Sequence, residues 1–340
     1  MVDYPDSADL LEPLPDPPEP LPLVIGPKLA PFTPMAHADI EFIKELGNPE
    51  QDLDSRVWEV KIDGAETHYA LKIFYFNHYG YLSQSSGGYM SRRLASRQRY
   101  IDFFDPFNCE CRVYGRLKQE EREDLAVRAH GYLLLTPEQE DELCRMIEGI
   151  DYDEPVDPDK NGNGTNTWGR WEQHHHLPLR AIVKDLATHP DPFKPAQITD
   201  MWKDLEELHG LGILVRDITV FNYYNAKLID FSRAWTWPHP SLDAITSYHL
   251  KDQLQRDPGG LEDVIVEWGI DMRWNWDEVE ISQDLQDCAS GKGEGERGPF
   301  GVDPRLYDWR KWEEDLVAAD EFMEHELYAE VEEAEDEWQS

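Results

Sequence analysis

The chain has 340 residues, and its 70 acidic residues outnumber its 32 basic residues, which gives a formal net charge of −38. This excess of negative charge repels phosphate backbones and anionic lipids, so we expect no direct nucleic-acid binding and instead expect basic partner proteins. No apolar run approaches the ~18 residues that cross a membrane, and the acidic, proline-rich start lacks the pattern of a secretory signal. The four cysteines form no disulfide or zinc pattern, so we expect an intracellular protein, cytoplasmic or nuclear.

Residues 1–34 are predicted to form an extended or disordered acidic arm. They hold ten prolines among acidic residues and leucines, and each proline fixes φ and removes a backbone donor. Because too few apolar residues fall in register for burial, we expect this arm to contribute no core.

Three strands are predicted next. Apolar alternation places them at Ile40–Leu46, Arg56–Ile62 and His68–Phe76. The pair Asp63-Gly64, between the second and third strands, is typical of a tight hairpin turn.

Residues 77–105 are predicted to be an insertion that carries a basic patch. The patch consists of Arg92, Arg93, Arg97 and Arg99. In so acidic a chain it is either a docking surface or a solvated helix face that balances the chain's own carboxylates, and the sequence leaves both interpretations open.

A helix is predicted after this insertion, because Phe107, Tyr114 and Leu117 fall on one helical face. Cys109 and Cys111 lie two positions apart, where helical side chains diverge, so we interpret them as reduced thiols and not as metal ligands.

The middle of the chain is predicted to hold a strand at 125–135, an acidic insertion at 137–176, a strand at 179–186 and a helix at 196–209. Part of the insertion resembles a calcium-binding loop, but Trp168 stands where that loop needs its last glutamate, so we reject a calcium site. The run His174 to His176 is expected to be solvated.

The stretch from Leu208 to Trp235 carries the residues with the clearest chemistry. After a turn with two glycines, a short strand at 213–215 leads into a polar loop with Asp217 and Asn222. A tight hairpin turn and a second short strand at 227–229 then end at Asp230. Adjacent strand ends therefore deliver two carboxylates and an amide to one place, as in phosphoryl-transfer sites. The alternative is an ordinary β-hairpin whose polar loop caps the strands.

The segment Val215-Arg216-Asp217, followed by four residues and Asn222, resembles the protein-kinase catalytic loop H-R-D-x-x-x-x-N. Asp230-Phe231-Ser232 resembles the D-F-G motif, with Ser in place of Gly. The resemblance implies that Asp217 is the catalytic base and that Asn222 and Asp230 bind Mg²⁺.

Two further residues follow from the same resemblance. Ala70-Leu71-Lys72-Ile73 resembles the V-A-I-K strand, which implies that Lys72 meets the phosphates of ATP. Glu110 in the predicted helix is the candidate for the glutamate that holds this lysine. The alternatives, Glu120, Glu121 and Glu123, lie in a solvated charged run. Asp185 and Leu186 end the strand that leads to a kinase hinge, which implies contact with the nucleotide.

The connection between the first two strands departs from the kinase pattern. Gly47 and Val57 match the first Gly and the Val of a Gly-rich loop, which implies nucleotide contact, but the other glycines are missing. The backbone needs glycine there to approach phosphates closely. The carboxylates of Glu50, Asp52 and Asp54 would instead repel a triphosphate. The A-P-E motif of an activation segment is also missing.

The wider pattern is similar to a divergent fungal family of kinase-like kinetochore Sim-complex subunits, as seen in CECRVYGRL, LRAIVKDL and ILVRDITVFNYYNAKLIDFSRAW. The resemblance implies an α+β, two-lobed kinase-like fold and a kinetochore location. The small β-rich N-lobe is expected over 35–186, and a reduced, mostly helical C-lobe over 187–340. The latter ends in a predicted amphipathic acidic helix, Trp309 to Trp338, which either packs on the C-lobe or frays into a tail. Binding of a partner by this helix is a further alternative.

Two functions are compatible with these observations. The first is an atypical kinase that uses ATP and Mg²⁺, and the retained polar residues favour it. The second is a pseudokinase-like interaction subunit, which the acidic loop after Gly47 and the missing activation segment favour. Clustered carboxylates repel one another unless a cation sits between them, so the sequence favours retained nucleotide or metal binding.

Overall fold

The computed structural model describes residues 21–22, 26–33, 38–47, 54–76, 102–147, 168–170, 174, 176–187, 195–239, 242 and 247–269. Several predicted features lie outside these residues: the basic patch at 92–99, the acidic residues 50 and 52, the stretch resembling a calcium loop and the helix predicted for 309–338.

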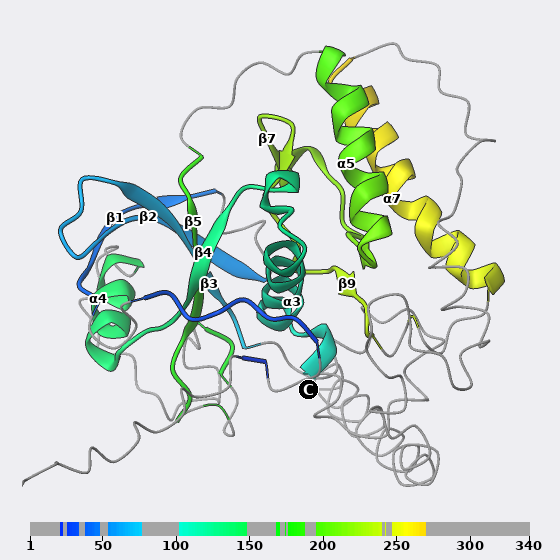
Figure 1. Cartoon of the computed structure of the whole chain (residues 1–340). Coiled ribbons are helices and arrows are strands. Elements are labelled where there is room, and N and C mark those ends of the chain that lie inside the picture. Colours follow the sequence, from blue (N-terminus) through cyan, green and yellow to red (C-terminus); the bar gives the residue numbers. More distant parts are fainter. Residues whose placement is uncertain are drawn as a thin grey trace, which may run out of the picture.

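An antiparallel sheet of five strands forms the N-terminal half (Figure 1). Its strand order is β1-β2-β3-β5-β4. The strands are β1 (Ile40–Leu46), β2 (Ser55–Ile62), β3 (His68–Phe74), β4 (Ala129–Leu134) and β5 (Arg180–Asp185). Asp63 and Gly64 have φ of 53° and 66°, as the tight turn predicted between β2 and β3 requires.

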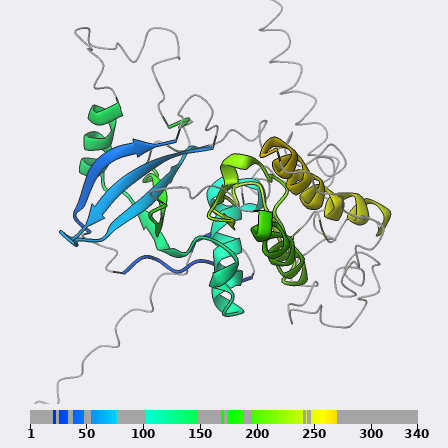
Figure 2. The same cartoon turned by 90° about the horizontal axis from the view of Figure 1, so that it is seen from above.

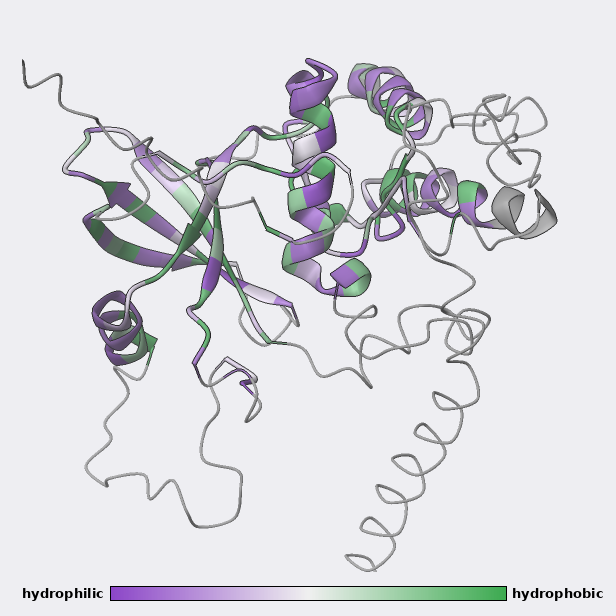
Figure 3. Cartoon of the chain, turned by 60° about the horizontal axis from the view of Figure 1, so that its bottom comes forward, coloured by the Kyte–Doolittle hydropathy of each residue, from purple (hydrophilic) through white to green (hydrophobic). Residues whose placement is uncertain are grey.

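Both faces of this sheet are covered. Helix α3 (Pro106–Gln119) packs on one face, where Phe74 and Ile182 contribute to its core. On the other face, Leu143 of α4 (Pro137–Ile147) and Trp168 join a second core with strand residues such as Val60. Figure 3 shows that α4 is hydrophilic over most of its surface, and Leu143 is its one buried residue. The insertion predicted at 137–176 therefore contains a helix that shields the sheet.

His174, expected to be solvated, is buried instead. Its ring stacks on Phe76 with a centroid distance of 5.0 Å, and only 8% of the residue is exposed. An imidazole that stacks on an aromatic ring buries apolar area that a solvated loop histidine would expose.

Helix α3 begins at a strong cap. The Asp105 carboxylate accepts hydrogen bonds from the backbone N–H groups of Phe107 and Asn108, and Pro106 occupies the first turn. The same carboxylate accepts two hydrogen bonds from Arg180 of β5, at 2.9 and 3.1 Å. The start of α3 is therefore tied to the sheet.

Among the described residues, the C-terminal half consists of two helices and two pairs of short strands. The helices are α5 (Ile198–Gly210) and α7 (Ser247–Glu267). One strand pair is β6 (Ile213–Leu214) with β9 (Trp235–Thr236), and the other is the hairpin of β7 (Tyr223–Tyr224) and β8 (Lys227–Leu228). Single 3-10 turns occur at η1 (Glu123–Leu125), η3 (Pro195–Gln197) and η4 (Val220–Asn222). Figure 2 shows α3 between the sheet and the pair α5/α7, and one core cluster runs from the sheet through α3 to α5 and α7. None of the described helices is long and apolar enough to cross a membrane.

The expectation that residues 1–34 contribute no core is wrong for residues 26–33. Leu29 is fully buried in the main core, and its backbone N–H donates to the carbonyl of Cys111, at 2.8 Å. The main chain of this segment finds hydrogen-bond partners on α3 and β4, which the proline count alone does not reveal.

The Asp105 cap generates a prediction about stability. Asp105→Ala removes both the cap and the partner of Arg180, so we expect the unfolding free energy to fall by more than the ~1 kcal/mol typical of a lost cap. Asp105→Asn keeps a capping oxygen and loses only the charge, so it should lie between Asp105→Ala and wild type. Urea unfolding of the three proteins measures this order, and equal losses in the two variants would contradict it.

Candidate functional site

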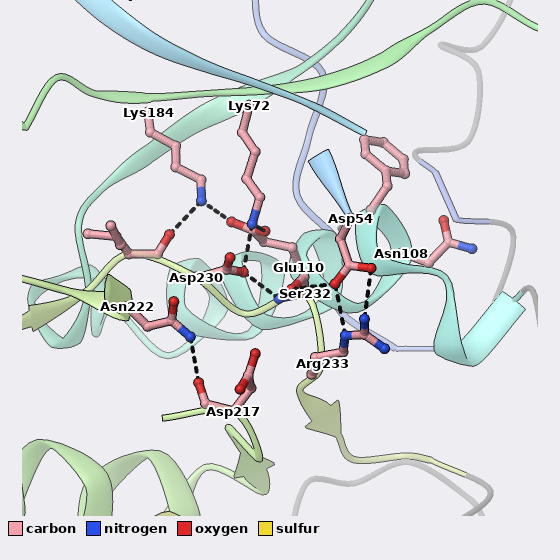
Figure 4. Close-up of polar contacts among 12 residues, drawn as sticks. Asp54, Lys72, Asn108, Glu110, Lys184, Asp217, Asn222, Asp230, Ser232 and Arg233 are labelled. Atoms are coloured by element: carbon pink, nitrogen blue, oxygen red, sulfur yellow. Dashed lines mark hydrogen bonds and ion pairs between the residues drawn. The ribbon is translucent and has the colours of Figure 1, made fainter. Parts of the chain in front are cut away.

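Lys72 lies on β3 and points into the space between the sheet and the C-terminal half (Figure 4). Its Nζ is 2.8 Å from Oε2 of Glu110 and 2.6 Å from Oδ1 of Asp230. The side chain is only 4% exposed. Of the candidate glutamates, the structure therefore pairs Glu110 with this lysine.

Glu110 has a second cation that the sequence analysis missed. Lys184 of β5 forms an ion pair with Oε1 of Glu110 and donates to the carbonyl of Ile229, at 2.8 Å. Ala70 and Lys72 pair with Lys184 and Ile182, respectively, so both lysines lie on one face of neighbouring strands. The sequence does carry a signal for Lys184, because this lysine directly follows the apolar run Ala181–Val183 in a strand of the sheet.

The charges of this cluster stabilise one another. Burial raises the pKa of Asp230, but the ammonium groups of Lys72 and Lys184 outweigh burial and hold that pKa well below its usual range. Burial lowers the pKa of Lys72, but Asp230 and Glu110 outweigh it and leave the pKa raised. Asp230 and Lys72 therefore both stay charged at neutral pH.

Asp217 and Asn222 lie on the C-terminal side of the same cleft (Figure 4). The side-chain amide of Asn222 donates to the backbone carbonyl of Asp217, at 2.7 Å, which fixes the loop that carries both residues. Partial burial raises the pKa of Asp217, and the charge of Asp230 raises it further. The structure thus brings Asp217 and Asp230 within electrostatic reach of each other.

Asp54 reaches into the cleft from the start of β2. Arg233 donates to both of its carboxylate oxygens, at 2.8 and 2.9 Å, and the Ser232 hydroxyl lies 3.4 Å away. Burial raises the pKa of Asp54, while the charges of Arg233 and Lys72 lower it. The sequence analysis did not predict this contact, an ion pair that joins the start of β2 to the segment after Asp230.

The other residues expected to contact the nucleotide do not all face the cleft. Val57 pairs with Lys72 across β2 and β3, so its side chain lies on the cleft face of the sheet. Gly47 directly follows β1, has a φ of 86° and is exposed. Asp185 follows Lys184, so its side chain turns to the opposite face, where its carboxylate lies 2.6 Å from His130. Leu186 follows the strand and is partly buried.

The backbone just before Asp217 is held by a carboxylate that the sequence analysis did not single out. Asp257 of α7 accepts hydrogen bonds from the N–H groups of Val215 and Arg216, at 2.8 and 2.6 Å, and lies 2.9 Å from His209. Arg216 has a φ of 67°, and its guanidinium stacks 3.6 Å from the ring of Trp235. Asp257 thus stabilises an unusual backbone conformation one residue before Asp217.

Helix α3 also holds the segment that follows Ser232. Arg112 donates to the carbonyls of Thr236, at 2.7 Å, and Pro238, while Arg116 donates to that of Trp237, at 2.8 Å. Both arginines are at most 1% exposed. Sequence spacing hid them, because their partners are carbonyls more than 100 positions away.

The described residues contain no group of three or more His, Cys, Asp or Glu side chains that could hold a metal ion. Cys109 and Cys111 are buried free thiols, and burial raises the pKa of both. A magnesium ion at Asp230 and Asn222 would therefore need other ligands, such as phosphate oxygens, to fill its coordination shell.

Residues 17–235 match the family model described as "Kinetochore Sim4 complex subunit FTA2". The chain belongs to the FTA2 family. This membership confirms the resemblance to kinetochore Sim-complex subunits and the expected kinetochore location, and it implies protein partners. No curated protein matches the chain in sequence.

The structure of vaccinia related kinase 3 is a similar solved structure, with 12% identity, a TM-score of 0.34 and coverage of 88% of this chain and 85% of that chain. The chain's own topology is kinase-like, as predicted. A five-stranded antiparallel sheet precedes helices α5 and α7, and a lysine of β3 pairs with a glutamate of the helix that follows. The fold class predicted for this FTA2-family chain is therefore confirmed.

The two lysines at Glu110 generate a prediction of non-additivity. Lys72→Met or Lys184→Met alone leaves Glu110 with one cation, whereas the double variant leaves a buried carboxylate unpaired. Breaking a buried pair costs about 3–5 kcal/mol, so we expect the double variant to lose more unfolding free energy than the sum of the two single variants. Adding Glu110→Gln to the double variant should restore part of the loss. Additive losses without rescue would show that the lysines act independently.

Proposed function

We propose that this FTA2-family chain is a pseudokinase-like interaction subunit of a kinetochore complex. The observation that carries the proposal is that the charged groups of the cleft pair with one another. Lys72 and Lys184 neutralise Glu110, Lys72 also binds Asp230, and Arg233 binds Asp54.

A nucleotide and its metal would have to break two of these pairs, Lys72 with Asp230 and Arg233 with Asp54. The pair of Lys72 with Glu110 is also present in an active kinase. In a kinase the β3 lysine and the D-F-G aspartate serve the phosphates and their metal, but here Oδ1 of Asp230 is shared by Lys72 and the backbone N–H of Ser232. Asp54 adds a carboxylate that is attracted to Lys72 and Arg233, the cations that a phosphate would use. Removing a partner from a buried pair is costly, so the paired cleft favours a structural role.

The partners follow from family and charge. The family is described as a kinetochore complex subunit, and the net charge of −38 favours basic protein surfaces. We infer that the chain binds basic partner proteins, through which it reaches centromeric chromatin without contacting nucleic acid itself.

An atypical kinase is the second candidate, and the 2.8 Å contact between Lys72 and Glu110 favours it. In that case Lys72 binds the phosphates of ATP and Asp217, with its raised pKa, receives the acceptor proton. Asn222 and Asp230 would hold Mg²⁺ together with phosphate oxygens. The nucleotide would lie against the residues of the sheet's cleft edge: Gly47, Val57, Leu186 and the backbone of Asp185. Bound Mg²⁺ would supply the charge neutralisation that phosphoryl transfer needs.

Thermal shift with ATP, with and without Mg²⁺, separates the two candidates. For an interaction subunit we expect no metal-dependent shift of the melting temperature in wild type. Binding would be easy to detect, because a ligand at ~100 times its Kd adds about 2.7 kcal/mol to the unfolding free energy. Asp54→Asn keeps the shape but removes the competing charge, and should also show no shift. A shift that needs Mg²⁺, that Asp230→Asn abolishes and that Asp217→Asn retains would establish the second candidate instead.

Matched alleles test the interaction role in cells. Asp217→Asn removes the proposed base outside the buried ion pairs, so we expect kinetochore location and complex recovery to stay at wild-type levels. Glu110→Gln removes the carboxylate that Lys72 and Lys184 share, and should lower both readouts together with the melting temperature. Loss of complex function in a stably folded Asp217→Asn protein would contradict a purely structural role.

A further inference from the structure

Residues 26–33 run along helix α3 and the edge strand β4. They are the dark blue trace that crosses in front of α3 in Figure 1. Leu29 N–H donates to the Cys111 carbonyl, at 2.8 Å, and Phe32 N–H donates to the Tyr132 carbonyl, at 2.8 Å. The N–H of Tyr132 donates in return to Ala30, at 3.2 Å, and Pro31 forms a parallel bridge to Tyr132. The segment therefore extends the sheet at its free edge, as peptides that add a strand do.

Two glycines make room for this segment. A Cβ at Gly115 would lie 2.3 Å from backbone atoms of Lys28, and a Cβ at Gly131 would lie 2.5 Å from backbone atoms of Phe32. Neither glycine has a positive φ, so space and not backbone conformation requires glycine there. Gly115 also stands inside helix α3, where glycine weakens a helix relative to alanine. The surface is thus shaped as a slot for an extended peptide backbone.

The slot lies beside the ion-pair cluster. The carbonyl that Leu29 binds belongs to Cys111, the residue after Glu110, and Leu29 itself is fully buried in the core that α3 shares with both halves. One side of α3 therefore contacts residues 26–33, while Glu110 meets the lysines of β3 and β5 on another.

We propose that residues 26–33 are a strap, a peptide segment that docks into the slot of Gly115 and Gly131 and holds α3 so that Glu110 stays between Lys72 and Lys184. The occupant of the slot is this chain's own N-terminal segment. The strap goes beyond the proposed function, because it would position Glu110 whether or not the cleft binds a nucleotide.

A pair of helical glycines gives a matched test. Gly115→Ala places a methyl group in the strap's path, whereas Gly259→Ala in α7 places one where no atom lies within 4 Å. We expect Gly115→Ala to lower the melting temperature and to speed hydrogen exchange of residues 26–33 and of Tyr132. Gly259→Ala should leave that exchange unchanged and keep or raise the melting temperature. Fast exchange of residues 26–33 in wild type, or equal behaviour of the two variants, would overturn the strap.

Cleaving the full chain tests whether the strap is a separable peptide. A protease site placed at 34–37, between the strap and β1, is cut after the protein has folded. We expect the released fragment to co-elute with the body and to exchange with a labelled peptide of residues 20–36. A peptide carrying Leu29→Ala should fail to exchange in. Alkylation measured residue by residue should then label Cys111 faster when the fragment is displaced, with Cys109 unchanged. Loss of the fragment without any change at Cys111 or in the melting temperature would overturn the proposal.

Discussion

The buried carboxylate of Glu110 is the constraint on which the rest of the structure depends. It is fully buried on a helix packed against a sheet, and a buried charge is costly unless it is paired and hydrogen-bonded. Lys72 and Lys184 meet that requirement from two neighbouring strands. The two lysines also contact the C-terminal half: Lys72 pairs with Asp230, and Lys184 donates to the carbonyl of Ile229. These ion pairs and this hydrogen bond therefore join the two halves of the molecule.

Helix α3, which carries Glu110, is held by contacts on several of its sides. Its first turn is capped by Asp105 and tied to β5 through Arg180, and its arginines bind the carbonyls of 236–238. Residues 26–33 contact it on a further side. A helix held at so many points has little freedom to rotate, whereas kinase regulation works by moving the equivalent helix in and out of contact with the β3 lysine. This rigidity agrees better with a structural subunit than with a switchable enzyme.

The sequence revealed local features well and distant partners poorly. Apolar alternation and the Asp63-Gly64 turn predicted the first three strands. The order of the kinase-like motifs predicted that Lys72 pairs with Glu110. Lys184 was missed because its partner lies 74 positions away on α3. Asp257 was missed because it binds backbone N–H groups, which every residue other than proline has. The burial of Leu29 was missed for a related reason: composition describes the solvation of an isolated segment and not a slot formed by Gly115 and Gly131 elsewhere in the chain.

The same compensation gives the residues of the kinase-like motifs a structural role. A carboxylate such as Asp230 needs a cation beside it, and in this chain Lys72 lies within ion-pair distance of it. Asp54 and Arg233 neutralise each other at the other end of the cleft. Once these groups compensate one another, losing any of them exposes a partner to the cost of an unpaired buried charge. Stability alone is then a reason for the chain to keep the residues that phosphoryl transfer would also require. The presence of these residues is therefore weaker evidence for catalysis, and the pairing of their charges is stronger evidence for a scaffold.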